Sequence, residues 1–309
     1  MTFGAADVTV LIPTRNRRDL VLVAIESARE QTMQAAEILV VDDGSTDGTA
    51  KAIQALEQTG TPVRVISGPE KGVGPARNAG LAACSTSLVC FLDSDDQLAS
   101  DALEQGLAEW WENDTMLVFS AVQFPGPHRV LTKPTEGDAF SIAGLLGSES
   151  DFNPPWGLAR VDHLQAIGGF TDELPCAVDY DLLLRLCAEG RHVRCLREPV
   201  YRYKREEGTE SVSGNEARNY KARLGALDRL HAGWEALVEQ HSTQFSSIRV
   251  RFLLRLCTAM RQQDSPLTHE QKRELRGYAS QALKLQPLRV RVIANSLRCA
   301  LVQTGGAGE

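Results

Sequence analysis

The chain is organised around the stretch Leu88-Val-Cys-Phe-Leu-Asp-Ser-Asp-Asp96. Its apolar first half is typical of a buried strand. Its second half places three carboxylates within four positions: Asp93, Asp95 and Asp96. Two unit charges about 4 Å apart repel by roughly 4 kcal/mol at an effective dielectric near 20. Such a strand end favours a compensating cation, and oxygen ligands suit Mg²⁺ or Mn²⁺. A simple acidic turn that caps the next helix is the alternative, although Ser100 and Asp101 are nearer caps.

The segments around this stretch alternate between strand and helix patterns. Strands are predicted over residues 8–12, 37–41, 63–67, 88–92 and 116–124. Helices are predicted over residues 19–31, 46–58, 75–83 and 100–112. Strict alternation of this kind predicts an α/β fold with a parallel, doubly wound sheet and helices on both faces. Ligands bind at the carboxyl ends of the strands in such sheets.

Two of these strand ends carry polar loops. After the first strand, Pro13-Thr14-Arg15-Asn16-Arg17 contains no glycine, which disfavours a dinucleotide-binding Rossmann unit. After the second strand, the later part of Asp42-Asp43-Gly44-Ser45-Thr46-Asp47 is explained as a turn and helix cap. Asp42 is not needed for that cap and can accept hydrogen bonds from a ribose or a base edge. For Asp43, functional and structural interpretations both stay open.

The third strand is followed by a glycine-containing loop, Lys71-Gly72-Val73-Gly74-Pro75, which leads into a helix. Glycines let the backbone approach a ligand, and a helix N-terminus favours an anion. Arg77, one turn into the helix, is a candidate contact to a phosphate or a base. A glycine-rich turn before a helix is common, so this loop alone is a weak signal.

Composition and charge indicate one large domain with an extension. The 309 residues are 43% hydrophobic and 24% charged, which is ordinary for a globular protein. No apolar run approaches the ~20 residues that span a bilayer, and residues 1–8 lack a secretory signal, so we expect a cytoplasmic protein. Seven cysteines lie in apolar runs without a Cys-x-x-Cys pair, which predicts reduced structural thiols. Residues 221–309 carry 14 Lys and Arg against 7 Asp and Glu, whereas the net charge of the whole chain is −7.

Taken together, the strand-end motifs resemble those of the family 2 glycosyltransferases with the GT-A fold. The resemblance covers about residues 7–205. It rests on four segments: Ile12-Pro-Thr-Arg-Asn16, Val41-Asp-Asp-Gly-Ser-Thr-Asp47, Lys71-Gly-Val-Gly-Pro-Ala-Arg-Asn-Ala-Gly80 and Phe91-Leu-Asp-Ser-Asp-Asp96. It implies a mostly parallel, Rossmann-like sheet within a domain of residues 1–213. Residues 7–123 would form the nucleotide-sugar-binding half, 124–213 the acceptor half and 214–309 a helical C-terminal extension.

The resemblance also implies roles for individual residues on the donor side. Asp93-x-Asp95 would be the DxD motif, in which Asp95 binds the Mn²⁺ or Mg²⁺ that bridges the donor diphosphate. Asp93 would face the ribose, and Asp96 would assist. The residues expected to bind the donor are Pro13, Thr14, Asn16, Asp42, Gly72, Arg77, Asp93, Ser94 and Asp95.

On the acceptor side, the segments 168–174 and 178–186 match the family's Gly-Gly-Phe-Asp-Glu and Glu-Asp-Tyr-Asp patterns. The resemblance assigns the general base to Asp179, with Asp181 as the alternative. Two carboxylates at a helix start also have a purely structural interpretation, because they complement the helix dipole. The sequence departs from the family pattern at Thr171, usually Asp, and at Val178, usually Glu.

Several further features leave alternatives open. Trp156 would either stack on a sugar or anchor a loop. Lys204 and Arg205 lie near the position at which members of the family often have a histidine. They would contact the diphosphate rather than a metal ion. Beyond residue 214, helices are predicted over 217–240, 245–262, 269–285 and 288–301. Their arginines would either dock on a membrane or partner, or lie on a packed, solvated helix face.

We therefore expect a metal-dependent, inverting glycosyltransferase. Its donor would be a nucleotide-diphosphate sugar, most simply a UDP-sugar, and its acceptor a glycan, a lipid-linked sugar or a small molecule. We expect no nucleic-acid partner, and a cytoplasmic location with possible peripheral contact at the inner face of the membrane. A nucleotidyltransferase that forms nucleotide-sugars and a catalytically weak or non-enzymatic sugar-binding protein are the alternatives.

Overall fold

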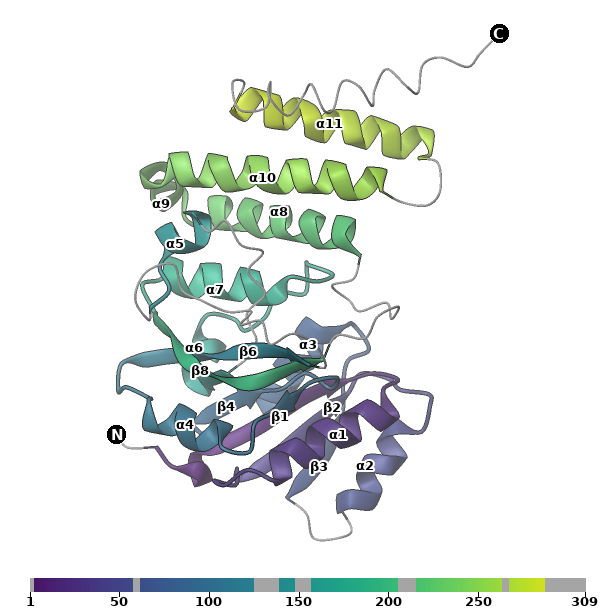
Figure 1. Ribbon diagram of the computed structural model, residues 1–309, viewed down its shortest axis with the longest axis vertical. Coiled ribbons are helices and arrows are strands. Elements are labelled where there is room, and N and C mark those ends of the chain that lie inside the picture. Colours follow the sequence, from purple (N-terminus) through teal and green to yellow (C-terminus); the bar gives the residue numbers. More distant parts are fainter. Residues whose placement is uncertain are drawn as a thin grey trace. The chain divides into compact units, whose positions relative to one another are not determined.

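The computed structural model describes residues 3–57, 62–124, 139–147, 157–204, 215–262 and 267–286. The chain divides into two compact units, Met1–Thr209 and Glu210–Glu309. The described part of the first unit holds a β-sheet and its flanking helices, and that of the second unit consists of helices (Figure 1).

The first unit contains an eight-stranded sheet with the order β3-β2-β1-β4-β7-β6-β8-β5. The strands are β1 (Val8–Thr14), β2 (Glu37–Asp42), β3 (Val63–Ser67), β4 (Leu88–Phe91), β5 (Gln97–Leu98), β6 (Asp114–Phe124), β7 (Gly157–Arg160) and β8 (His192–Lys204). The predicted α/β fold class is confirmed, and the five predicted strands of the first half all form. A short 3₁₀ helix, Ala5–Asp7, precedes β1.

The sheet is mixed rather than wholly parallel. Strands β1, β2, β3 and β4 pair in parallel, and so do β6 and β8. The antiparallel strand β7 lies between β4 and β6, and the two-residue strand β5 pairs antiparallel with β8. The mostly parallel sheet is thus confirmed, whereas the two antiparallel strands were not predicted, because β7 and β5 are too short to show a period in the sequence.

The helices of the first half cover both faces of the sheet (Figure 1). Helices α1 (Arg18–Arg29) and α2 (Thr49–Glu57) pack side by side, while α3 (Val73–Ala83) packs over β1 and β2 and contacts α6 (Val161–Ala166). The chain reverses direction across the sheet between β3 and β4. Right-handed crossovers therefore place α3 on the opposite face from α1 and α2. The same reversal brings the carboxyl ends of β1, β2 and β4 together at one edge.

Some helix bounds differ from the predicted ones. Helix α4 runs only over Ala102–Ala108, and not over 100–112, because buried Asp114 accepts a hydrogen bond from the Trp111 N–H (2.9 Å) and turns the chain into β6. The remaining helices of this unit are α5 (Ile142–Gly147) and α7 (Val178–Ala188).

The second unit is helical in its described part, as its sequence pattern predicts. It contains α8 (Glu216–Gly233), α9 (Glu235–Gln240), α10 (Ser242–Arg261) and α11 (His269–Leu285), with α10 packed against both α8 and α11. The single helix predicted over 217–240 is broken at Trp234, whose φ of −139° and ψ of 54° are not helical. The helix predicted over 288–301, the loop with Trp156, and Arg205 lie outside the described residues.

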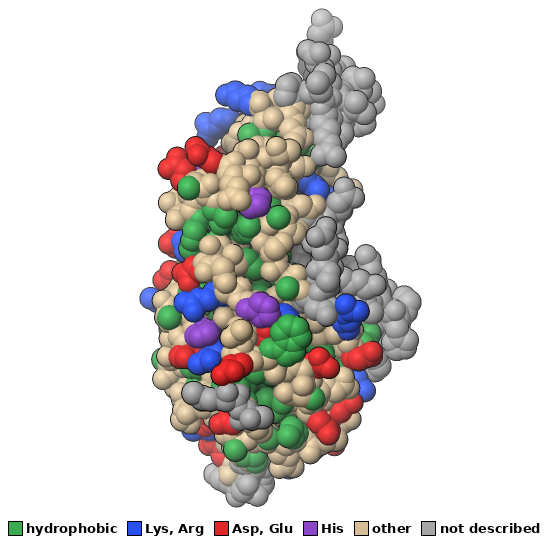
Figure 2. All heavy atoms as spheres, turned by 90° about the vertical axis from the view of Figure 1, so that its left-hand side faces the viewer, with side chains coloured by type: hydrophobic (Ala, Val, Ile, Leu, Met, Phe, Trp, Pro, Cys, Tyr) green, Lys and Arg blue, Asp and Glu red, His purple; other side chains and the backbone are tan. Residues whose placement is uncertain are grey.

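In the part of the chain described here, no helix combines the length and apolar character needed to cross a membrane. On the face drawn in Figure 2, acidic and basic side chains of the described residues are interspersed among hydrophobic and uncharged ones.

The close approach of β7 to β6 yields a test of this sheet order. A Cβ at Gly157 would lie 2.0 Å from the Leu117 carbonyl oxygen and 2.9 Å from the Phe119 nitrogen. Both are backbone atoms of β6, which cannot move without breaking the ladder. We expect Gly157→Ala to lower the free energy of unfolding by about 2–4 kcal/mol in urea titrations followed by circular dichroism. Gly4→Ala, where a Cβ would meet no atom within 4 Å, is the control and should change it little. Equal effects of the two substitutions would contradict the pairing.

Candidate functional site

The ends of β1 and β2 meet through backbone pairing. Thr14 pairs with Asp42 in the parallel register, and the Asp43 N–H donates to the Thr14 carbonyl (2.8 Å). Pro13 and Thr14 are buried, and within the described structure the Thr14 hydroxyl oxygen has no hydrogen-bond partner. Asp42 accepts the Ser45 N–H (3.0 Å) with one carboxylate oxygen. The Thr14 hydroxyl and the second Asp42 oxygen can therefore serve a ligand at this edge.

Asn16 joins the loops that follow β1 and β2. It adopts a left-handed conformation with φ of 51°. Its N–H donates to the Ser45 hydroxyl (2.8 Å), and its carboxamide oxygen accepts the Thr46 N–H (2.7 Å). The carboxamide oxygen is already hydrogen-bonded within the protein, so Asn16 holds the two loops together. Its place in the donor site stays a prediction.

Residues Asp93–Asp96, the acidic turn, follow β4 after Leu92. The turn is closed by a hydrogen bond from the Asp96 N–H to the Asp93 carbonyl (3.1 Å). Asp93 forms an ion pair with Arg77 (2.5 Å), and Asp95 forms one with Arg17 (2.6 Å). The turn thus meets two arginines from different elements.

Asp96, in contrast, is held inside the protein by uncharged donors. It is buried, and its carboxylate accepts the Tyr201 hydroxyl (2.9 Å) and the Lys204 N–H (2.8 Å). The same Tyr201 oxygen accepts the Asp93 N–H (3.1 Å), so one residue of β8 ties both ends of the acidic turn. Asp96 therefore supports the turn, which differs from the assisting role that the sequence comparison gave it.

Crowding and burial shift the acid–base equilibria of the turn. Burial, followed by the charge of Asp93, raises the pKa of Asp95 above its usual value. Burial, followed by the charges of Asp93 and Asp95, holds the pKa of Asp96 well above its usual range. Burial and the charge of Asp96 also hold the pKa of Tyr201 well above normal, which keeps its hydroxyl protonated as a donor. Added positive charge at this turn is therefore favourable.

The start of α3 is anchored to β2 by Asp43. The Asp43 carboxylate accepts the N–H groups of Glu70 (2.7 Å) and Gly72 (2.8 Å). Gly72 has φ of 101°, a conformation that residues with a Cβ rarely adopt, and no atom would crowd a Cβ there. The structure thus gives Asp43 a structural role, and Gly72 is required for its conformation rather than for space.

One turn further along α3, Arg77 is buried and fixed on two sides. Its guanidinium pairs with Asp93 and lies 5.4 Å from the centre of the Phe170 ring. Phe170 in turn packs edge-to-face on Phe91 of β4, with ring centres 5.4 Å apart. These contacts place the guanidinium beside the acidic turn.

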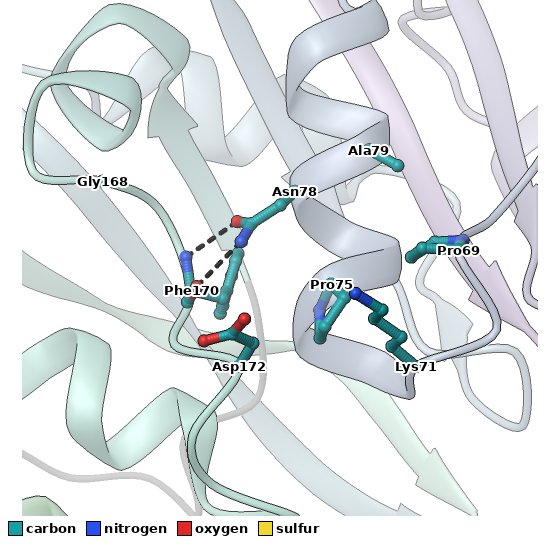
Figure 3. A pocket seen from close by; sticks show the side chains of 8 residues that line it. All are labelled: Pro69, Lys71, Pro75, Asn78, Ala79, Gly168, Phe170 and Asp172. Atoms are coloured by element: carbon teal, nitrogen blue, oxygen red, sulfur yellow. Dashed lines mark hydrogen bonds between the residues drawn. The ribbon is translucent and has the colours of Figure 1, made fainter.

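Asn78 links α3 to the loop before α7. Its side chain accepts the Phe170 N–H and donates to the Phe170 carbonyl, both at 2.8 Å (Figure 3). A hollow beside this link is lined by Lys71 and Pro75 on one side and by Asp172 on the other. Its lining includes Gly168, Phe170 and Asp172 of the acceptor-side segment, but none of the individual residues predicted to bind the donor or to act as the base.

The two candidate general bases differ in their surroundings. Asp181 is 1% exposed and paired with Arg185 (2.8 Å), whose guanidinium also donates to the carbonyls of Ile167 (3.0 Å) and Gly169 (2.6 Å). Asp179 is half-buried, at the start of α7, and one of its oxygens accepts the Tyr180 N–H (2.8 Å). Asp181 therefore holds the 167–169 turn in place, and Asp179 is the more exposed of the two carboxylates.

The geometry adds two residues that the sequence analysis did not select. Arg17 stands three residues beyond the end of β1. The sequence feature that could have identified it is a basic residue in the loop after one strand, when the loop after a neighbouring strand is acidic. Tyr201 lies inside β8, and nothing in its sequence context distinguishes it from a core aromatic. Its importance follows only from the pairing of β8 with β5, which brings Tyr201 opposite Leu98.

Comparison with known proteins places this site in a family. The family model described as glycosyl transferase family 2 matches residues 9–159. The succinoglycan biosynthesis protein ExoU of Rhizobium meliloti (strain 1021) is 30% identical over 280 residues, which cover 82% of this chain and 79% of that protein. The chain belongs to the family 2 glycosyltransferases.

Other relatives of this family 2 glycosyltransferase are much longer. Chondroitin synthase of Pasteurella multocida (strain Pm70) is 30% identical over 186 residues, which are 60% of this chain but 19% of that protein. The chain thus spans about a fifth of the length of that relative.

Two solved structures confirm the predicted GT-A fold of the family 2 glycosyltransferase. S. aureus TarS 1–349 in complex with UDP has a TM-score of 0.66 at 18% identity, covering 92% of this chain and 82% of that chain. The mannosyltransferase PcManGT from Pyrobaculum calidifontis, in complex with GDP-Man and Mn²⁺, has a TM-score of 0.61 at 19% identity, covering 100% and 89%.

The different surroundings of the two acceptor-side carboxylates predict different stabilities of their variants. Asp181→Asn should lower the free energy of unfolding by about 3 kcal/mol, because it leaves the buried Arg185 charge without its counter-ion. Asp179→Asn should lower it by less than about 1 kcal/mol, because this side chain is half-exposed. Urea unfolding of both variants provides the measurement. A larger loss for Asp179→Asn would show that the two roles are reversed.

The Tyr201 bridge predicts a pH-dependent loss in the phenylalanine variant. Tyr201→Phe removes a donor to the Asp96 carboxylate and should cost about 1–2 kcal/mol. Asp96 has a raised pKa in the folded protein, so its carboxylate is ionised only above that raised value. The missing donor therefore costs more as the pH rises through that value, and urea unfolding over a series of pH values should show a loss that grows with pH. Tyr278→Phe, on α11, is the control, and a loss that is independent of pH would argue against the bridge.

Proposed function

We propose that this chain transfers a sugar from a nucleotide-diphosphate sugar to an acceptor hydroxyl, with inversion at the anomeric carbon. The observation that carries the proposal is the acidic turn, which two arginines face at the carboxyl end of β4. Family membership supports the reaction class, and the relatives named above support a place in polysaccharide or glycolipid synthesis.

The donor is proposed to bind in the half formed by residues 7–123. The buried Thr14 hydroxyl and Asp42 would receive the base and ribose, with Pro13 and Asn16 shaping the loop beside them. Arg77, fixed by Asp93 and Phe170, would present its charge to the nucleotide. UDP is the first nucleotide to test, because a structure of similar fold holds it.

A divalent ion fits the acidic turn as a partner of the donor diphosphate. In the part of the chain that the structure describes, no group of three or more His, Cys, Asp and Glu is arranged to hold an ion alone. Asp95, with Asp93, offers carboxylates whose crowding favours added positive charge, and Mg²⁺ is often held by one or two carboxylates plus substrate phosphates. When bound, Mn²⁺ or Mg²⁺ would supply Lewis-acid stabilisation of the leaving diphosphate.

The acceptor is proposed to enter over the half formed by residues 124–213. Asp179 would take the proton from the acceptor hydroxyl as its oxygen attacks the anomeric carbon. A single displacement needs no protein nucleophile, which matches the separation of the two acidic sites into one for the leaving group and one for the base. The half-buried position of Asp179 supports this assignment over Asp181.

The second unit, residues 214–309 in the predicted division, is proposed to make the contact with a membrane or partner. Helix α10 alone carries four arginines and no acidic residue. Arg249 is paired with Asp228, and the remaining charge would suit an anionic membrane surface.

The proposal is tested with UDP-, GDP- and dTDP-sugars in the presence of Mn²⁺ or Mg²⁺. We expect metal-dependent release of the nucleoside diphosphate from at least one donor, faster when an acceptor is present. Asp95→Asn should lower the rate at least a hundredfold at any metal concentration, and Asp179→Asn should lower kcat while leaving donor affinity within about threefold. Arg29→Gln, at the far end of α1, is the control variant. Failure to bind any of these donors would overturn the transferase proposal, and a full rate in Asp179→Asn would overturn the base.

A further inference from the structure

Arg17 reaches the acidic turn from the start of α1. It is the residue before the first helical turn, and its carbonyl accepts the Val21 N–H (2.9 Å), which fixes its backbone. Its guanidinium lies 2.6 Å from a carboxylate oxygen of Asp95 and 3.5 Å from the Ser94 hydroxyl. Only the side chain of Arg17 is therefore free to change partner.

The two arginines at the turn are held differently. The Arg77 side chain is 4% exposed and is enclosed by Asp93 and Phe170. The Arg17 and Asp95 side chains are 28% and 29% exposed, so their ion pair is reached by solvent and is weakly bound. Arg77 is a fixed part of the site, whereas Arg17 is exchangeable.

The Arg17 contact conflicts with a metal ion at Asp95. The guanidinium occupies the carboxylate that a divalent ion would use, and a charge of +1 at that distance repels a charge of +2. A nucleoside diphosphate reverses this balance, because its terminal phosphate carries a negative charge that the ion does not neutralise, and the same charge develops on the donor diphosphate as its bond to the sugar breaks. A guanidinium fork also matches phosphate oxygens well.

We propose that Arg17 is an exchangeable counter-ion, which holds Asp95 while the site is empty and moves to the donor diphosphate when a divalent ion takes Asp95. This inference rests on the proposed function, since it requires both the ion and the diphosphate. It deepens that function by giving a physical cause for joint binding. Arg17 opposes the ion when it arrives alone and stabilises the ion–diphosphate pair.

The test separates the two halves of this exchange by binding measurements without catalysis. Mn²⁺ affinity is measured by calorimetry on the nucleotide-free chain. The affinity for whichever of UDP, GDP and dTDP binds the wild-type chain is then measured at saturating Mn²⁺. In Arg17→Gln we expect Mn²⁺ alone to bind about fivefold more tightly and the nucleotide about tenfold more weakly. Arg17→Lys keeps the charge without the fork and should bind Mn²⁺ as the wild type does, and Arg18→Gln, the neighbouring exposed arginine, should change neither affinity.

The possible outcomes are distinct. Opposite changes in the two affinities support the exchange, because structural damage would weaken both. Unchanged or weaker Mn²⁺ binding in Arg17→Gln overturns it and leaves Arg17 as a strut between α1 and the turn. Tighter binding of both ligands overturns the contact with diphosphate. If neither the wild type nor Arg17→Gln binds Mn²⁺, the metal assignment of the proposed function fails and the exchange fails with it.

Discussion

The repulsion among three carboxylates at the end of β4 is the constraint on which the rest of the site depends. Each of them is offset by a different element. Arg17 comes from the start of α1, Arg77 from α3 and the Tyr201 hydroxyl from β8. Because these elements are far apart in the sequence, the acidic turn can form only when both halves of the sheet are assembled. The repulsion among the three carboxylates is therefore relieved only in the assembled fold, which couples the formation of the site to folding.

Helix α3 connects the donor and acceptor sides. Asp43 fixes its first residues to the end of β2, and the Asn78 side chain fixes its second turn to the backbone of Phe170. Between these two points, Arg77 is held against the acidic turn. A shift of the loop before α7 would therefore move Phe170, and with it the guanidinium on the donor side. The proposed donor and acceptor sides are thus joined through one helix.

Much of this arrangement could be predicted from the sequence, and the rest fails for physical reasons. The strands of the first half are apolar and their ends are polar, so the strands could be predicted, and the structure places Asp42, Asp93 and Asp95 at or after the ends of strands of the same parallel group, with Arg77 paired to Asp93. The four-residue strand β7 and the two-residue β5 carry no period and were missed. Arg17 and Tyr201 were missed because their partners lie 78 and 105 residues away, and a sequence pattern records local spacing only.

The two departures from the family pattern have a common structural context. Thr171 and Val178 are both buried, and both adjoin Gly74 at the start of α3, where a Cβ would lie 2.7 Å from the Thr171 carbonyl and 3.4 Å from a Val178 methyl. An acidic side chain at position 178 would lose its hydration among the closely packed atoms around Gly74, where the apolar valine packs without that cost. The neighbouring Asp179 is left as a carboxylate without an adjacent acid. Asp179, which we propose as the base, therefore lies between the buried side chains of Val178 and Tyr180 rather than beside a second carboxylate.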